Sequence, residues 1–255
     1  MEEGARPAGL AILRRLLAYA RKVLQWEDPL DAIGDARCRP QIRTSVILRA
    51  VVVLFLARLG SLNALEQTHA SRSWPRWLLG ALPSADTVGR VCAQVEPSDV
   101  RALHHSIYVR LKRMKALVPP THGLMAAAID GHESHATYRR CCPGCLKRTI
   151  HTTQGDRTQY YHRHVALQLI GCDFHSVGRR TAATRWHADH VYKHDPTALL
   201  VFCLVAMICL TVFVVFCTRN LKPQARRNAS MLHIARLISA DLYRTIPAGP
   251  PRTPM

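Results

Sequence analysis

The chain has 255 residues and carries 35 Lys and Arg against 17 Asp and Glu, which gives a formal net charge of +18. With 48% hydrophobic and 20% charged residues it has enough apolar side chain for a core, which excludes an acidic tail protein or a wholly unfolded chain. A surface this basic attracts polyanions: nucleic acid is the commonest partner, and anionic lipid is the rival.

The N-terminal third is predicted to be helical. Apolar residues recur at three- and four-residue intervals over 10–24, as they do on one face of an amphipathic helix. A second helix is predicted over 44–65, where the sequence is apolar nearly all round. Because this run is short and contains Arg49 and Arg58, burial inside protein is favoured over a membrane span. A short third helix is predicted to begin at Ser84, a residue typical of helix N-caps.

A longer helix is predicted from Pro97 to about Pro119. One face is apolar, and the other carries basic and aromatic side chains spaced by four, three, four and three residues: Arg101, His105, Tyr108, Lys112 and Lys115. A basic stripe with an aromatic residue in it is typical of helices that contact DNA phosphates, so this face is the predicted DNA-binding surface. A solvated helix face is the alternative interpretation.

Three strands are predicted after Pro120, over 124–129, 149–153 and 160–170, and an antiparallel meander is the expected arrangement. The first strand is expected to end at Asp130. A carboxylate at a strand end is suited to metal-dependent phosphoryl chemistry, in which carboxylates hold two cations, although one Asp alone cannot do this. Acidic residues in that position are also common turn formers and helix caps.

A possible zinc knuckle lies in the same region. Cys142 and Cys145 are three residues apart around a Pro-Gly turn, and His135 and His151 flank them as possible further ligands of Zn²⁺. A single Cys-x2-Cys pair is a weak signal, and two free thiols are the alternative. The nine cysteines of the chain are an odd number, which favours reduced intracellular thiols over a disulfide framework.

The stretch 197–217 contains no charged residue and is predicted to be a helix opened by Pro196. At 1.5 Å per residue it is long enough to cross a bilayer, so a single-pass basic membrane protein of the inner membrane is one interpretation. Burial inside the protein is the favoured one. A last amphipathic helix is predicted over 223–243, and the proline-rich segment 246–255 is expected to be a disordered tail.

Four blocks, taken together and in order, resemble the DD(E/D) insertion-sequence transposases. The blocks are Leu82-Pro-Ser-Ala-Asp-Thr-Val-Gly-Arg90, Asp130-Gly-His-Glu133, Gly155-Asp-Arg-Thr-Gln-Tyr-Tyr-His-Arg-His164 and Trp186-His-Ala-Asp-His-Val-Tyr-Lys-His-Asp-Pro196. The resemblance implies a ribonuclease H-like catalytic domain, Mg²⁺ as cofactor, and Asp130 as the first catalytic carboxylate. It also implies that the 197–217 helix is buried against that domain.

The chain departs from this family in its middle. Only eleven residues separate Phe174 from Trp186, and none is acidic, where the resemblance calls for further strands, a second Asp and a Glu-bearing helix. The sequence therefore predicts an internally deleted transposase, joined in frame within 175–184. Asp130 would then be a vestigial carboxylate that binds Mg²⁺ weakly. An active transposase completed by carboxylates of another subunit is the alternative.

The expected architecture is accordingly α+β. It comprises a helical, DNA-binding region at 1–120, a remnant of the ribonuclease H-like domain at 121–175 with an incomplete sheet of about three antiparallel strands, and a helical segment at 176–245. The expected function is binding of the DNA ends of a mobile element without cleavage. The expected location is the cytoplasm, on the nucleoid. A homo-oligomer is possible, and the membrane is an alternative partner through 197–217.

Overall fold

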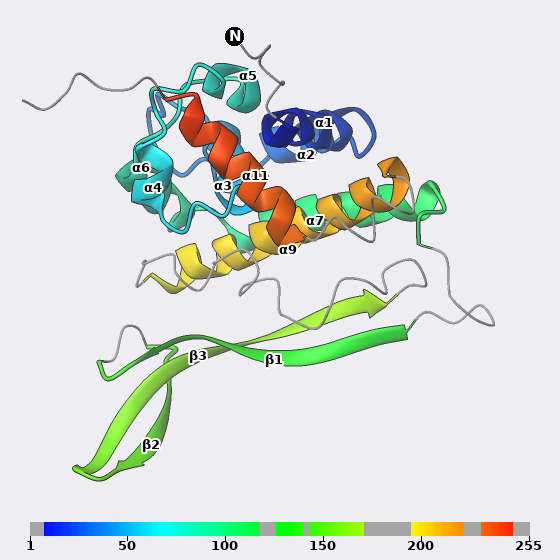
Figure 1. The fold of residues 1–255 in the computed structure, drawn as a ribbon. Helices are drawn as coiled ribbons and strands as arrows, with labels where there is room; N and C mark the ends of the chain where they lie inside the picture. Colours follow the sequence, from blue (N-terminus) through cyan, green and yellow to red (C-terminus); the bar gives the residue numbers. More distant parts are fainter. Residues whose placement is uncertain (1–7, 118–125, 140–142, 171–194, 222–230, 247–255) are drawn as a thin grey trace, which may run out of the picture.

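The computed structural model describes residues 8–117, 126–139, 143–170, 195–221 and 231–246. Within these residues the chain is α+β, with nine helices and one three-stranded antiparallel sheet. Helices from both ends of the chain pack together, while the strands from the middle of the sequence form a separate layer below α7 and α9 (Figure 1). The expected α+β class is therefore confirmed.

The longer helices lie close to their predicted positions. The helices in chain order are α1 (Ala8–Lys22), α2 (Glu27–Asp31), α3 (Thr44–Leu56), α4 (Leu62–Glu66), α5 (Trp74–Leu78), α6 (Ala85–Cys92), α7 (Pro97–Arg113), α9 (Pro196–Asn220) and α11 (Met231–Arg244). Ser84 caps α6 as predicted, because its hydroxyl accepts a hydrogen bond from the Thr87 backbone N–H at 3.3 Å.

The single helix predicted over 44–65 is wrong, because the chain breaks after α3. Arg58 and Gly60 both have positive φ, at 50° and 80°, which no α-helix can continue through. Ser61 then starts α4, its hydroxyl accepting a hydrogen bond from the Ala64 N–H at 3.0 Å. The helix predicted to reach Pro119 is also shorter than expected and ends at Arg113.

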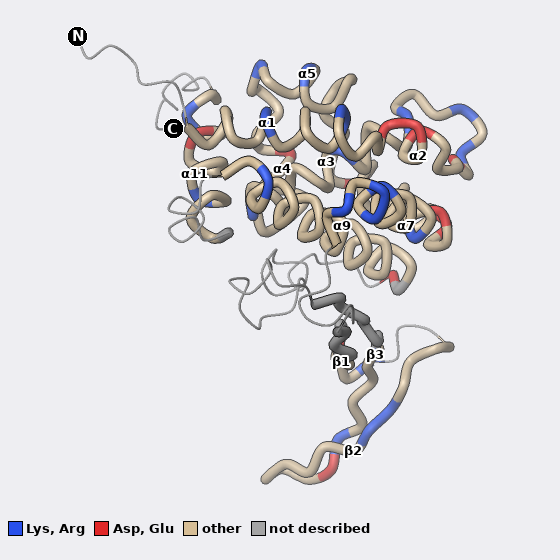
Figure 2. Tube along the Cα trace, turned by 90° about the vertical axis from the view of Figure 1, so that its right-hand side faces the viewer, with Lys and Arg blue, Asp and Glu red and all other residues tan. Residues whose placement is uncertain are grey.

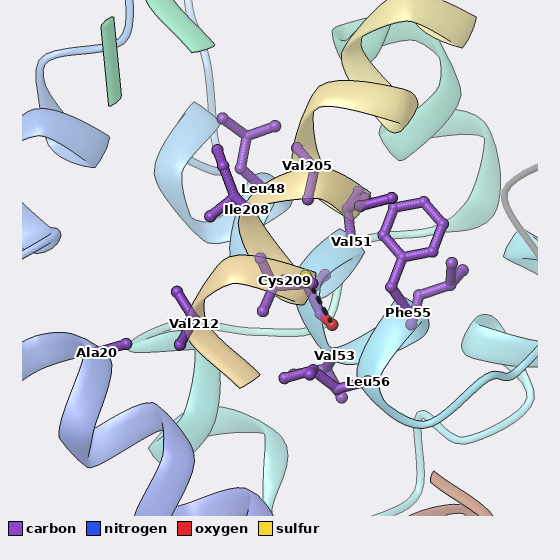
Figure 3. Close-up of a cluster of buried hydrophobic side chains, with 14 of the residues drawn as sticks. Ala20, Leu48, Val51, Val53, Phe55, Leu56, Val205, Ile208, Cys209 and Val212 are labelled. Carbon is purple, nitrogen blue, oxygen red and sulfur yellow. Dashed lines mark hydrogen bonds between the residues drawn. The ribbon is translucent and has the colours of Figure 1, made fainter. Parts of the chain in front are cut away.

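The core is built around α3 and α9. Figure 3 shows Val51 and Phe55 of α3 facing Val205, Ile208 and other apolar side chains of α9. These side chains are fully or almost fully buried, and burial of each large aliphatic or aromatic side chain contributes about 1.5–3 kcal/mol. The central helix of the molecule is therefore the same apolar segment that the sequence offered as a membrane span.

α9 is long and apolar enough to cross a membrane, and among the described helices it alone meets that test. In the structure 72% of its most apolar stretch is buried inside the protein. Its cover comes mainly from α1, α3, α6 and α7. The expectation that the strand-bearing domain would cover this helix is wrong, because helices of the N-terminal region provide the apolar surface.

Arg49 on α3 is 3% exposed and forms ion pairs with two carboxylates of α2, Glu27 and Asp31, the second at 3.3 Å. A buried guanidinium is tolerated only when paired, and removal of one partner from such a pair costs about 3–5 kcal/mol. This contact explains how an arginine fits into an otherwise apolar helix, and it fixes α2 against α3.

The two ends of the chain meet where α1 packs on α11. The Asp241 carboxylate is 5% exposed and accepts hydrogen bonds from the backbone N–H groups of Gly9 and Leu10, at 2.7 and 3.3 Å. It thus caps the N-terminus of α1 from 232 residues away. Gly9 lies so close to α11 that a Cβ atom there would be 2.3 Å from the Leu237 backbone.

The sheet consists of β1 (Ala126–Thr137), β2 (Leu146–Thr152) and β3 (Gly155–Ile170), in the order β1-β3-β2. All pairs are antiparallel, but the predicted meander is wrong because the long β3 lies between the other two strands. β2 and β3 form a tight hairpin, in which Gly155 adopts a φ of +106° that other residues rarely take.

Several predicted segments lie outside the described residues: the loop with the expected join at 175–184, nearly all of the segment 186–196, the beginning of the helix predicted at 223, and the tail from 247 onward.

Candidate nucleic-acid interface

The orientation of α7 is fixed by its apolar face. Val100, Leu103, Ile107 and Leu111 are all buried, at helical spacing, and α7 packs mainly on α9. Pro97 lies in the first turn, where its missing N–H breaks no hydrogen bond of the helix. Asp99 lies in the same turn, where its negative charge interacts favourably with the positive end of the helix dipole. With one face held in this way, the opposite face must point to solvent.

The predicted DNA-binding stripe lies on that outward face. Arg101, His105, Tyr108 and Lys112 are exposed residues of α7, and Lys115 is an exposed residue in the turn that follows. The rings of His105 and Tyr108 lie 6.1 Å apart and are tilted by 35°. Four of the predicted residues therefore share the outward face of α7 and Lys115 follows in the next turn; we call these five residues the α7 basic face. Figure 2 shows Lys and Arg positions in blue along the trace of α7.

In the part of the chain that the structure describes, no carboxylate pairs with the cations of this surface. The sequence has no Asp or Glu between 100 and 117, and within the described residues Arg101, Lys112 and Lys115 form no ion pair. The nearest acidic residue on the helix, Asp99, accepts a hydrogen bond from the Gly34 N–H at 3.3 Å instead. The positive charges are consequently available to an anionic ligand.

Further basic groups, which the sequence pattern did not predict as part of the site, lie at the C-terminal end of α7. The Arg219 side chain of α9 donates to the Met114 carbonyl at 3.2 Å, and the Arg110 side chain donates to the Val23 carbonyl at 3.1 Å. Arg113 is exposed in the last turn. The alignment of α9 beside α7 places Arg219 here, and no local sequence signal could have revealed it.

His104 lies between α7 and α9, with its Nε2 atom 3.3 Å from the Thr211 hydroxyl. Burial lowers the pKa of His104 from its ordinary value, and the neighbouring His105 lowers it further. His104 is therefore neutral near pH 7, and the charge that α7 offers to a ligand comes from its outer face.

Asp130 lies inside β1 rather than at a strand end, which corrects the prediction. The strand continues for seven residues beyond it, and Asp130 is paired with Ala166 of β3. The side chain of Asp130 lies outside what the structure describes. Beyond Asp130 the ladder with β3 continues as far as Thr137, with a register shift between Glu133 and His135.

The described residues do not fit a Mg²⁺ centre. Glu133, the carboxylate closest to Asp130 in sequence, is held by two guanidinium groups, Arg148 at 2.8 Å and Arg163 at 2.9 Å. Among the residues that the structure describes, no group of three or more His, Cys, Asp and Glu side chains is arranged to hold a metal ion.

The predicted zinc ligands are only partly described. Cys142 and the side chain of His135 lie outside the description. Cys145 directly precedes β2 and His151 lies near its far end, roughly 20 Å away at about 3.3 Å per strand residue. His151 pairs with Asp156 at 2.7 Å, whereas the Sγ atom of Cys145 lies 3.4 Å from Nε2 of His162. Strand pairing thus brings His162 to Cys145, in place of His151.

Comparison with known proteins adds no family to this picture: no family model, no curated protein and no solved structure matches the chain.

Proposed function

We propose that the chain is a transposase-derived DNA-binding protein of a mobile element, and that the α7 basic face contacts the DNA backbone at the element ends. The observation that carries this proposal is the exposure of five predicted side chains, four on one face of α7 and Lys115 in the turn that follows, with no carboxylate among them. Lys and Arg that approach phosphates release condensed counterions, which makes such a face a strong, sequence-independent DNA contact.

The dimensions of the face suit duplex DNA. Arg101 and Lys112 are eleven residues apart, about 16 Å along a helix that rises 1.5 Å per residue. The major groove of B-DNA is about 12 Å wide, so a helix of this length reaches phosphates on both sides of a groove. Tyr108 and His105 lie between the two cationic ends, where they can donate hydrogen bonds to phosphate or sugar oxygens.

Helix stability alone does not account for this pattern. Basic side chains near a helix C-terminus stabilise it by about 0.3–1 kcal/mol, which is reason enough for Lys112 and Lys115. Arg101, in contrast, lies near the positive end of α7, where the helix dipole disfavours a cation. A DNA contact accounts for all the basic residues of the α7 basic face, whereas the helix dipole accounts only for Lys112 and Lys115.

In this proposal β1–β3 are the remnant of the ribonuclease H-like domain, with Asp130 as its vestigial first carboxylate. Binding without cleavage follows from the sequence, since the second Asp and the Glu of the DD(E/D) set have no counterpart there. The proposed location is the cytoplasm, on the nucleoid. α9 gives a membrane location less support, because most of its apolar surface is already covered by other helices.

The test is the salt dependence of duplex binding, measured by fluorescence anisotropy with a labelled DNA duplex. Replacement of Arg101, Lys112 and Lys115 by Ala should weaken binding on all sequences alike. The slope of log K against log salt should fall by about 0.9 for each lost phosphate contact, close to 3 in total.

A matched control removes the same charge elsewhere. Arg72, Arg76 and Arg236 are exposed on other parts of the helical body, and they form no ion pair within the described residues. The triple alanine variant of these three should bind duplex DNA with nearly the wild-type slope. Equal slopes for the two triple variants would show that α7 is not the DNA surface.

A further inference from the structure

Arginine and tyrosine side chains alternate on one face of the sheet. The Arg148 guanidinium lies 4.8 Å from the centre of the Tyr161 ring, and the Arg163 guanidinium lies 5.5 Å from it. The Arg157 guanidinium lies 5.9 Å from the ring of Tyr138. These five residues, which we call the Arg-Tyr face, come from β2, from β3 and, for Tyr138, from the position that directly follows β1.

Strand register explains why they gather. Successive residues of a strand point to opposite faces, so positions 157, 161 and 163 of β3 share one face. Arg148 joins them from β2, because it is paired with Gln159 and its Nε donates to the Gln159 side chain at 2.8 Å. Glu133 joins from β1, paired with Arg163.

Within the described residues this face has an excess of positive charge, and some of its guanidinium N–H groups have no hydrogen-bond partner there. The Glu133 carboxylate accepts one hydrogen bond from Arg148 and one from Arg163. Both guanidinium groups lower the pKa of Glu133, and Arg163 has the larger effect. One carboxylate against three guanidinium groups leaves two positive charges. Arg157 is the least engaged of the three, since its contact with Gln154 is 3.5 Å long.

Of the two tyrosines of this face, Tyr138 is the exposed one. Tyr138 is 54% exposed, whereas Tyr161 is half-buried beneath its two arginines. Every residue of β2 is exposed or half-buried, so this end of the sheet has no apolar cover on either side within the described residues. Three-stranded sheets usually need such cover, and a ligand that supplies flat, apolar rings together with negative charge would provide it.

We propose that the Arg-Tyr face binds single-stranded DNA, with Tyr138 stacking on a base and Arg157 and Arg163 contacting phosphates. A single strand offers both components at once, an unstacked base and a charged backbone, whereas the bases of a duplex are stacked on one another and closed to an aromatic side chain. The inference goes beyond duplex binding by α7 and uses different residues, so it does not depend on the transposase origin.

The test measures the affinity of the full-length protein for a fluorescein-labelled oligothymidylate by anisotropy. Tyr138→Ala should weaken binding about 5- to 100-fold, the range for loss of one stacked base, with the salt slope unchanged. Tyr138→Phe should bind like the wild type. Arg157→Ala should weaken binding and lower the salt slope by about 0.7, the value for one phosphate contact with a single strand.

Two control variants match these changes. Tyr243 is an exposed tyrosine of α11, and Lys147 is an exposed cation next to Arg148 in β2, hence on the opposite face of the sheet. Tyr243→Ala and Lys147→Ala should leave oligothymidylate binding within about twofold of wild type. Losses as large as those of Tyr138→Ala and Arg157→Ala would overturn the proposal, as would wild-type protein that does not bind oligothymidylate.

The ligand class and the independence from α7 are decided in the same experiment. Oligouridylate that binds tighter than oligothymidylate would refute single-stranded DNA as the ligand. The α7 triple variant should lose duplex binding and keep the Tyr138-dependent binding of oligothymidylate. If instead the α7 triple variant binds duplex DNA like the wild type while oligothymidylate binding depends on Tyr138, the proposed function is wrong. The proposal that the Arg-Tyr face binds single-stranded DNA is then still supported.

Discussion

Replacement of Gly9 by Ala tests whether the two ends of the chain close the helical body. In a solvent-exposed helix this change stabilises by about 1 kcal/mol, because Ala is the better helix former. Here the new Cβ would lie 2.3 Å from the Leu237 carbonyl carbon and oxygen and 2.5 Å from the Ile238 nitrogen. These are backbone atoms that no side-chain rotation can move, so α1 and α11 must separate.

The clash outweighs the gain in helix propensity. Overpacking of a well-packed contact costs about 1–3 kcal/mol, and a backbone overlap of this depth belongs at the upper end. The shift also lengthens the hydrogen bonds from Gly9 and Leu10 to the buried Asp241 carboxylate. Gly9→Ala should therefore lower the free energy of unfolding by about 2 kcal/mol.

Asp241→Ala provides a second view of the same contact. It removes the cap of α1 and leaves a buried N–H without a partner, at a cost of about 2–3 kcal/mol. Asp241→Asn keeps one acceptor oxygen and should lose less. Urea unfolding followed by circular dichroism measures all three variants, with unchanged m-values as the sign that the unfolding transition is comparable.

Gly34→Ala is the matched control, because a Cβ there would meet only the Asp99 carboxylate, at an ordinary 3.6 Å. Its effect should stay within about 0.5 kcal/mol. If Gly9→Ala proved as stable as the wild type, or more stable by the propensity gain, α1 would not pack on α11 as the structure shows.

Two further predictions concern pH and catalysis. Because the pKa of His104 is lower in the folded than in the unfolded chain, the stability of the protein should fall as the pH drops below about 6.5. The stability of the His104→Gln variant should fall less between pH 7 and pH 5. In thermal melts, the control His69→Gln, at an exposed position, should follow the wild type. Purified protein with Mg²⁺ or Mn²⁺ should show no cleavage or strand transfer on the element ends; cleavage that disappears in Asp130→Ala would refute the proposed inactivity.

Local sequence signals predicted those helices and helix caps that depend on residues close together in the chain. Pro97 and the apolar spacing after it predicted α7, and Ser84 predicted the cap of α6; both are confirmed. The break after α3 was missed because a positive φ at Arg58 has no sequence signature as strong as that of Gly60.

Contacts between distant segments were not predictable in the same way. The cap that Asp241 gives to α1 joins residues 232 positions apart, and the partners of Arg49 lie in a five-residue helix that periodicity cannot reveal. The Arg-Tyr face was only partly predictable: alternation over the predicted strand 160–170 places Tyr161 and Arg163 on one side, whereas Arg157 joins them because β3 begins at Gly155. Arg148 belongs to this face because β2 pairs with β3 in a register that could not be predicted from the sequence.

The position of α9 bears on how a transposase with a shortened middle could keep a stable body. The proposed join lies between β3 and α9, so a deletion there removes neither α1, α3, α6 nor α7, the helices that cover α9. The contact of α1 with α11 joins the two ends of the chain, and α1 also packs on α9. Loss of catalytic strands would then abolish cleavage while leaving intact the core that supports the α7 basic face.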